Sequence, residues 1–182
     1  MDLQYNKIGK PYILGQKKFF TKRESEAFDF IKNNLPNLTN LRVLDIGCGN
    51  GIDIIKLEKL NPKEVWGIDI SEVMVSEAKK KVSDKDKVIV RNINNTLFEN
   101  NFFDIVVGRF SFHYLEEFDE AYNELSRILK EKGLLILTVH HPLRDLHLQK
   151  NRIYGQQEKV QIKLYNNQVP IIFPTHTLKD YF

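Results

Sequence analysis

The sequence predicts an α/β fold: a doubly wound, mostly parallel sheet with helices on both faces. Apolar runs alternate with helical patterns, a glycine-rich loop joins the first run to a helix, and the last run is apolar except for Thr138. Strands that alternate with helices are typical of parallel sheets. A nearly continuous apolar run such as Leu134–Val139 is expected to be a strand buried on both faces.

Turn residues separate the five expected strands. These strands are Leu41–Ile46, Glu64–Ile70, Lys87–Val90, Phe103–Gly108 and Leu134–Val139. Thr21 and Glu24 have the spacing of a capping box, which predicts a helix running through Leu35. A second helix is expected from about residue 51 to residue 60, where the turn Asn61-Pro62 follows.

The remaining helices are predicted from their caps and their apolar period. Ser71 is expected to cap a helix in which Val75, Ala78 and Val82 share one face. The next helix is expected over 118–129, and Gly133 is placed to end it. The region from residue 143 onward is less regular, and we expect a hairpin of Val160–Leu164 and Val169–Phe173 around Asn166-Asn167.

Composition limits the classes of protein that this chain can represent. It has 182 residues, 42% of them hydrophobic, which suits one folded domain. No apolar run reaches membrane-spanning length, so no membrane partner is expected. A single cysteine excludes an internal disulfide and favours a cytoplasmic protein. The net charge of +3, with Lys79-Lys80-Lys81 followed by acidic residues, makes nucleic acid an unlikely partner.

The loop Gly47-Cys48-Gly49-Asn50-Gly51 indicates a nucleotide-like cofactor. Alternate glycines let the backbone turn sharply and approach a ligand closely. The spacing departs from the dinucleotide fingerprint because the third glycine is one position early. Asp45 before the loop would oppose a pyrophosphate but suits an ammonium group. Asp69, at the end of the second strand, is placed to accept hydrogen bonds from two ribose hydroxyls.

An ordered series of motifs over roughly residues 5–142 resembles class I S-adenosylmethionine-dependent methyltransferases. The matching segments are Val43–Gly51, Gly67–Ser71 with Met74, Arg91–Ile93, Leu97-Phe98, Phe103–Val107, Phe110–Leu115 and Gly133–Leu137. The resemblance is to the small-molecule branch, with a domain like "methyltransferase type 11". It implies a Rossmann-like fold, S-adenosyl-L-methionine as cofactor and methyl transfer to a small molecule.

The resemblance also implies which residues hold the cofactor. The methionine end would lie against Asp45, Gly47, Cys48 and Gly49, with the backbone around Arg109 nearby. Ile70, Met74, Asn92 and Ile93 would contact the adenine, although Met74 is equally readable as helix core. Asn92 replaces the usual aspartate and can still accept a hydrogen bond. Tyr12, with Tyr5 and Gln16, matches a lid over the cofactor; simple cover for the sheet is the alternative.

The catalytic residues are less defined. His113, His140 and His141 follow the fourth and fifth expected strands, so one of them could act as a base or orient the substrate. For each histidine alone, a structural role is the more common outcome. The Arg109 side chain could bind an acidic substrate or make a surface ion pair. Cys48 is expected to be a packing residue, and no metal site is expected.

The domain organisation and the acceptor leave alternatives open. We expect one domain, with a lid and helix over 1–40, a cofactor-binding core over 41–142 and a substrate-side segment over 143–182. The related fold adds two strands to make a seven-stranded sheet, so the segment could be truncated. An exposed sheet edge could then cause self-association into a homo-oligomer. The alternatives to an active small-molecule enzyme are an inactive cofactor-binding protein and a tRNA or RNA methyltransferase.

Overall fold

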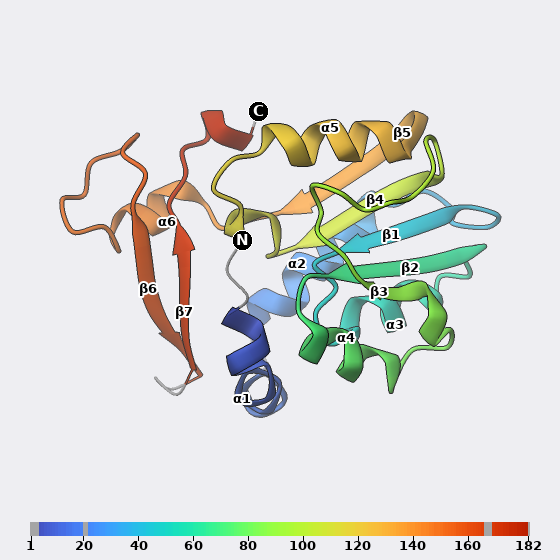
Figure 1. Cartoon of the computed structure of the whole chain (residues 1–182), viewed down its shortest axis with the longest axis horizontal. Coiled ribbons are helices and arrows are strands. Elements are labelled where there is room, and N and C mark those ends of the chain that lie inside the picture. The colour runs from blue at the N-terminus through green and yellow to red at the C-terminus, as the bar shows by residue number, and fades with distance from the viewer. Residues whose placement is uncertain (1–3, 20–21, 166–168, 182) are drawn as a thin grey trace.

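The computed structural model describes residues 4–19, 22–165 and 169–181. Within them, a parallel sheet has the strand order β3-β2-β1-β4-β5 (Figure 1). Its strands are β1 (Arg42–Ile46), β2 (Glu64–Asp69), β3 (Val88–Val90), β4 (Phe103–Arg109) and β5 (Leu129–Thr138). The order reverses between β1 and β4, so the loops that follow these two strands meet at the carboxyl edge of the sheet. The predicted doubly wound sheet is confirmed.

Helices cover both faces of this sheet. The helices α2 (Lys22–Asn34), α3 (Ile52–Glu58) and α4 (Glu72–Lys79) share one hydrophobic core with Val43 of β1. The helix α5 (Asp119–Ile128) packs in a second core, which contains Leu44 and Ile46. Successive side chains of a strand point to opposite faces, which explains why neighbours in β1 belong to different cores.

The caps agree with the sequence prediction at one helix and differ at another. Ser71 caps α4, and its hydroxyl accepts a hydrogen bond from the Met74 N–H. The prediction that Gly133 ends a helix is wrong, because α5 ends at Ile128 and Gly133 lies within β5. The pairing of β5 with β4 shifts register between Phe103 and Ile105, so this glycine lies in an irregular part of the strand. A Cβ on Gly133 would lie 2.8 Å from the backbone oxygen of Lys130.

The expected C-terminal hairpin is confirmed by the strands β6 (Lys159–Leu164) and β7 (Val169–Pro174). They pair antiparallel, with Ile162 opposite Ile171. Asn166-Asn167 of the predicted turn, and Thr21 of the predicted capping box, lie outside the described residues. The short helix α6 (Pro142–Leu146) and the 3-10 turns η1 (Lys85–Lys87), η2 (Phe112–Tyr114) and η3 (Lys179–Tyr181) complete the chain.

The helix α1 (Gln4–Phe19) bridges the sheet domain and the hairpin (Figure 1). It packs against α4 and β7. The side-chain amide of Gln4 donates to the backbone oxygen of Ile172 (2.7 Å) and accepts from its N–H (2.9 Å). Through these two hydrogen bonds the Gln4 side chain pairs with the outer edge of β7 and fixes the helix to the hairpin.

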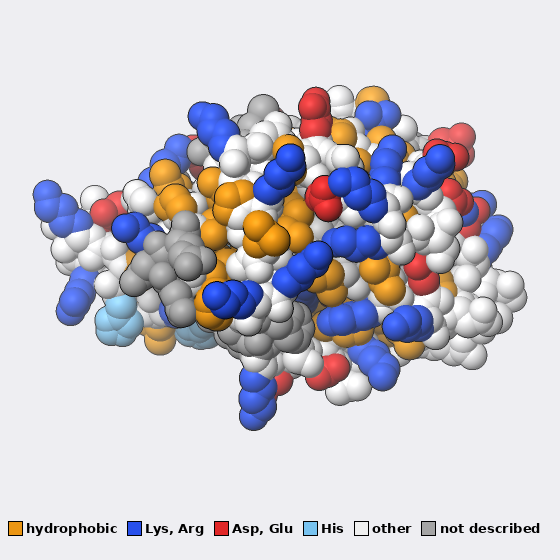
Figure 2. All heavy atoms as spheres, turned by 90° about the horizontal axis from the view of Figure 1, so that it is seen from below, with side chains coloured by type: hydrophobic (Ala, Val, Ile, Leu, Met, Phe, Trp, Pro, Cys, Tyr) orange, Lys and Arg blue, Asp and Glu red, His pale blue; other side chains and the backbone are white. Residues whose placement is uncertain are grey.

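The face seen in Figure 2 carries many lysine and arginine side chains, spread among apolar ones. On α1 the exposed lysines are Lys7, Lys10, Lys17 and Lys18. No helix in the described part of the chain is long and apolar enough to cross a membrane.

Candidate active site

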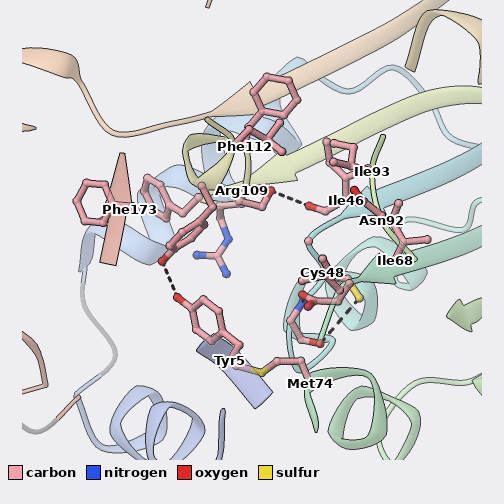
Figure 3. Close-up of a pocket in the computed structure, with 18 of the residues that line it drawn as sticks. Tyr5, Ile46, Cys48, Ile68, Met74, Asn92, Ile93, Arg109, Phe112 and Phe173 are labelled. Atoms are coloured by element: carbon pink, nitrogen blue, oxygen red, sulfur yellow. Dashed lines mark hydrogen bonds between the residues drawn. The ribbon is translucent and has the colours of Figure 1, made fainter. Parts of the chain in front are cut away.

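A pocket of about 540 Å³ opens at the carboxyl edge of the sheet, within the usual size range of small-molecule sites. The structure brings most of the predicted cofactor residues to it. Those that line the pocket are Tyr12, Gly47, Cys48, Gly49, Asp69, Ile70, Met74, Asn92, Ile93 and Arg109. Figure 3 shows several of them pointing into one cavity from different elements.

Two glycines shape the loop after β1. Gly47 has φ +65°, and a Cβ there would lie 2.3 Å from the Ser111 Cβ. The Ser111 hydroxyl donates to the backbone oxygen of Ile46, which fixes this close approach. Gly49 has φ +52°, and a Cβ there would meet no atom within 4 Å. Because Gly49 lines the pocket, the space beside it is available to a ligand.

Asp69 is held in place by backbone donors. One carboxylate oxygen accepts from the Gly49 N–H and the other from the Ser71 N–H, each at 2.8 Å. Burial raises the pKa of Asp69, while these backbone hydrogen bonds oppose the shift. A carboxylate oxygen can accept more than one hydrogen bond, so both oxygens can still serve a ligand in the pocket.

Asp45 lies beneath the loop rather than on the pocket wall. It is 2% exposed, and its Oδ2 makes no hydrogen bond. Burial raises its pKa well above the ordinary value; Asp53 adds to this shift, and Arg109 opposes it. Arg109 is itself ion-paired with Asp53 of α3. Although burial alone would lower the pKa of Arg109, the Asp53 carboxylate raises it. The Arg109 and Asp53 side chains are 10% and 9% exposed, so the pair is largely buried, unlike the surface ion pair that was one of the two expectations.

Met74 and Asn92 lie at the end of the pocket predicted to hold the adenine. Met74 is buried and also lines the cavity, so its two predicted roles are compatible. The Asn92 side-chain oxygen accepts from the Asn94 N–H at 3.0 Å. An amide oxygen has two lone pairs, so it can accept a second bond from a ligand.

The N-terminal helix α1 contributes side chains to the pocket lining, at the position that a lid would take. Tyr5, Tyr12 and Gln16 all line the pocket from α1. Gln16 accepts a hydrogen bond from the Asn50 side chain in the glycine loop (3.0 Å). The helix is therefore tied to the loop that would hold the cofactor.

Cys48 is a packing residue by geometry. It is 7% exposed, and its sulfur would lie 3.0 Å from a Cβ on Gly67. Burial raises the pKa of its thiol well above the ordinary value, and Asp45 and Asp69 add to the shift. A thiol that stays protonated is a poor nucleophile.

The prediction that the histidines face the cleft is wrong, since none of the three lines the pocket. His113 is buried against the rings of His140 and Tyr114, with centroids 4.2 and 4.3 Å away. Neighbouring residues in η2 face different ways, and Tyr114 takes the pocket position instead. His141 is exposed, and its Nδ1 accepts from the Leu143 N–H at the start of α6.

Sequence reasoning missed several pocket residues. Glu24, Asp53, Tyr114 and Phe173 line the cavity from α2, α3, η2 and β7. Asp53 sits in the first turn of the helix after the glycine loop, a position that could have suggested it. Phe173 carries no such signal, because only the packing of the hairpin brings it to the pocket.

Comparisons with known proteins decide the family. Residues 44–137 match the family model described as "Methyltransferase domain". The chain belongs to this family. It is a class I S-adenosylmethionine-dependent methyltransferase domain, and S-adenosylmethionine is its cofactor.

Relatives and solved structures agree with this assignment. A demethylmenaquinone methyltransferase from Bacteroides fragilis is 30% identical over 84% of this chain and 62% of its own length. A putative S-adenosylmethionine-dependent methyltransferase from Listeria monocytogenes has the same fold, with a TM-score of 0.68 and 24% identity over 86% of this chain and 80% of its own. Phosphoethanolamine N-methyltransferase 2 of Haemonchus contortus, solved with S-adenosyl-L-methionine, is 29% identical over 62% of this chain and 27% of its own, with a TM-score of 0.55.

The chain spans from about a third to three fifths of the length of the first curated relatives that it matches, with shares of 53%, 50%, 37% and 62%. The methyltransferase domain nevertheless offers what the cofactor requires. The unpartnered Asp45 Oδ2 can accept from an ammonium group, and the space beside Gly49 admits a ligand. The residues present therefore fit the cofactor.

Proposed function

We propose that this methyltransferase domain transfers a methyl group from S-adenosylmethionine to a small-molecule acceptor. The observation that carries the proposal is the Asp69 carboxylate beside the glycine loop, which accepts hydrogen bonds from the backbone N–H groups of Gly49 and Ser71. In this role Asp69 accepts hydrogen bonds from the ribose, and Asn92 accepts one from the adenine. The demethylmenaquinone methyltransferase relative, whose name describes a small-molecule acceptor, supports this choice.

The cofactor supplies an activated methyl group, so the protein contributes mainly positioning and exclusion of water. Asp45 stabilises the positive charge of the methionine end. The Arg109 side chain, ion-paired with Asp53, lies between the glycine loop and the aromatic side chains of α1. The helix α1 covers the reacting groups and keeps water away from them. The proposal assigns no role as a base to His113, His140 or His141.

Two measurements test the proposal. Calorimetry of S-adenosylhomocysteine with the intact protein should give one-site binding, and no binding would contradict it. A metabolite extract incubated with S-adenosylmethionine should then show a compound that gains the mass of one methyl group only when the protein is present. Cofactor binding without any such product would instead favour the inactive cofactor-binding alternative.

The RNA alternative is tested separately. The exposed lysines of α1 are the feature that would contact a phosphate backbone. Binding of a tRNA mixture that weakens steeply with salt would support this alternative. We expect no such binding at moderate salt, because the pocket itself is lined by carboxylates.

A further inference from the structure

The side of the pocket away from Asn92 is built from four aromatic rings, which we call the aromatic wall: Tyr5, Tyr12, Tyr114 and Phe173. They come from α1, η2 and β7, and all four line the pocket. Each ring meets the next edge to face, with centroids 5.2 Å apart for Tyr12 and Tyr5, 5.6 Å for Tyr5 and Tyr114, and 6.2 Å for Tyr114 and Phe173. Ile172 and Pro174 extend this apolar surface. Such surfaces bind flat apolar molecules through contact area and ring packing.

The wall carries one polar feature, a pair of hydroxyls. The Tyr5 and Tyr114 oxygens lie 2.5 Å apart and share a hydrogen bond. Burial raises the pKa of both tyrosines, so both stay protonated near neutral pH. One of the two protons holds the pair together, and the other remains able to donate to an oxygen of a bound molecule.

The charges around the pocket oppose an anionic acceptor. Asp53, Asp69, Glu24 and the four acidic residues of segment 116–120 line it, against the cations Arg91, Arg109 and Lys159 among the described residues. Two of these cations are already paired, Arg109 with Asp53 and Lys159 with Glu116. Arg91 lies beside Asn92, at the opposite end from the wall. An excess of carboxylates attracts a cationic cofactor and repels anions.

Resting on the proposed function, we propose that the acceptor is a flat, largely apolar ring compound without a carboxylate or phosphate, bound against the aromatic wall. Its oxygen substituent accepts a hydrogen bond from the hydroxyl of the Tyr5–Tyr114 pair whose proton is not used within the pair. Figure 3 shows Phe173 on the side of the pocket away from Cys48, Tyr5 beside Met74, and Arg109 pointing into the cavity between Phe173 and Cys48. The ring compound then lies at the Phe173 end of the cavity and the cofactor at the end that contains Cys48 and Asn92, with Tyr5 between the two.

A matched pair of probes tests the proposal on protein saturated with S-adenosylhomocysteine. The probe 2-naphthol is uncharged near neutral pH, and 2-naphthoate places a carboxylate on the same ring system. At low salt we expect 2-naphthol to bind about tenfold or more tightly than 2-naphthoate, because like charges oppose each other across a binding interface. Equal or tighter binding of 2-naphthoate, or no binding of 2-naphthol, would overturn the proposal. Failure of S-adenosylhomocysteine itself to bind would contradict the proposed function instead.

Two variants locate the interaction. Tyr114→Leu should weaken 2-naphthol binding by about fivefold or more, through loss of ring contact and of the hydroxyl pair, while S-adenosylhomocysteine binding is kept. The matched control is Tyr154→Leu, since Tyr154 is 48% exposed and does not line this pocket. An unchanged affinity in Tyr114→Leu, or an equal loss in the control, would count against the wall.

The second variant changes charge at an exposed site and so keeps the fold. Glu117→Lys should narrow the preference for 2-naphthol over 2-naphthoate by about twofold to fivefold, as expected for a charge several ångströms from the ligand. Glu131→Lys makes the same change in an exposed part of β5 outside the pocket lining and should leave the preference unchanged. Equal effects of the two substitutions would show that the pocket charges do not select the acceptor.

Discussion

Replacing Asp69 with asparagine tests the central feature of the cofactor site. Each carboxylate oxygen already accepts one backbone N–H, from Gly49 or Ser71, at 2.8 Å. An amide would turn one of these oxygens into a donor that faces an N–H. The variant therefore loses one backbone hydrogen bond and one acceptor for the ribose.

The expected loss of affinity follows from that count. A hydrogen bond to a charged group contributes about 1.5–3 kcal/mol, so S-adenosylhomocysteine should bind about 10- to 150-fold more weakly. The free energy of unfolding should fall by about 1–3 kcal/mol, because one backbone N–H is left without an acceptor. Burial raises the pKa of Asp69, so the loss of its charge does not add to this cost.

Calorimetry with S-adenosylhomocysteine and urea unfolding measure the two effects separately. Asp86→Asn is the matched control, because Asp86 is exposed in η1 and does not line the pocket. A folded Asp69→Asn protein that binds within about threefold of the unmutated protein would refute the ribose role.

Three further outcomes are expected. Gly47→Ala should lower the free energy of unfolding by about 1–3 kcal/mol or more, measured by urea titration. Alanine is strained at φ +65°, and its Cβ would also clash with Ser111. An unchanged free energy of unfolding would contradict this close packing. Hydrogen bonds from Arg127 lower the pKa of Glu124 to about 2, with Thr96 adding to the shift, so its stabilisation should be present above about pH 4 and lost as pH falls toward 2. Glu124→Gln should therefore destabilise the protein at pH 7 and have less effect near pH 2, and equal effects would refute this linkage. The edge of β5 not paired with β4 should favour self-association, which light scattering over a range of concentrations would detect; a monomer at all concentrations would count against it.

The sheet could be predicted because its signals are local. Each strand of the sheet contains an apolar segment, and the Ser71 cap depends only on its own helix. The strand β5 begins at Leu129, before the predicted apolar run, because its polar first half also pairs with β4. The helix α1 had no such signal, since Gly9, Pro11 and Gly15 normally interrupt helices. The structure explains both glycines by packing. A Cβ on Gly9 would lie 2.9 Å from Val73, and one on Gly15 would lie 2.3 Å from Tyr165.

The same distinction separates the cofactor side of the site from the acceptor side. Gly47, Gly49 and Asp69 follow β1 and β2 directly, so their position in the sequence predicts their place at the sheet edge. The histidines follow strands too, but the direction of each side chain depends on how η2 and α6 pack. Phe173 reaches the pocket from a hairpin that pairs with no strand of the sheet. Its place results from long-range contacts of β7 with α1 and η2, which no local pattern encodes.

The buried Asp45 links cofactor binding to pH. Because folding raises its pKa, the folded protein binds more protons than the unfolded chain at pH values between about 4 and the raised pKa. The stability from this group is present below about pH 4 and is lost as pH rises through the raised value. An ammonium group at the unpartnered Oδ2 would lower that pKa again, so binding of S-adenosylhomocysteine should release protons, and its affinity should rise with pH in this window. Calorimetry in phosphate and in Tris, which differ in ionisation enthalpy, should give different apparent enthalpies that become equal in Asp45→Asn. Identical enthalpies for the unmutated protein across the window would show that the ammonium does not meet Asp45.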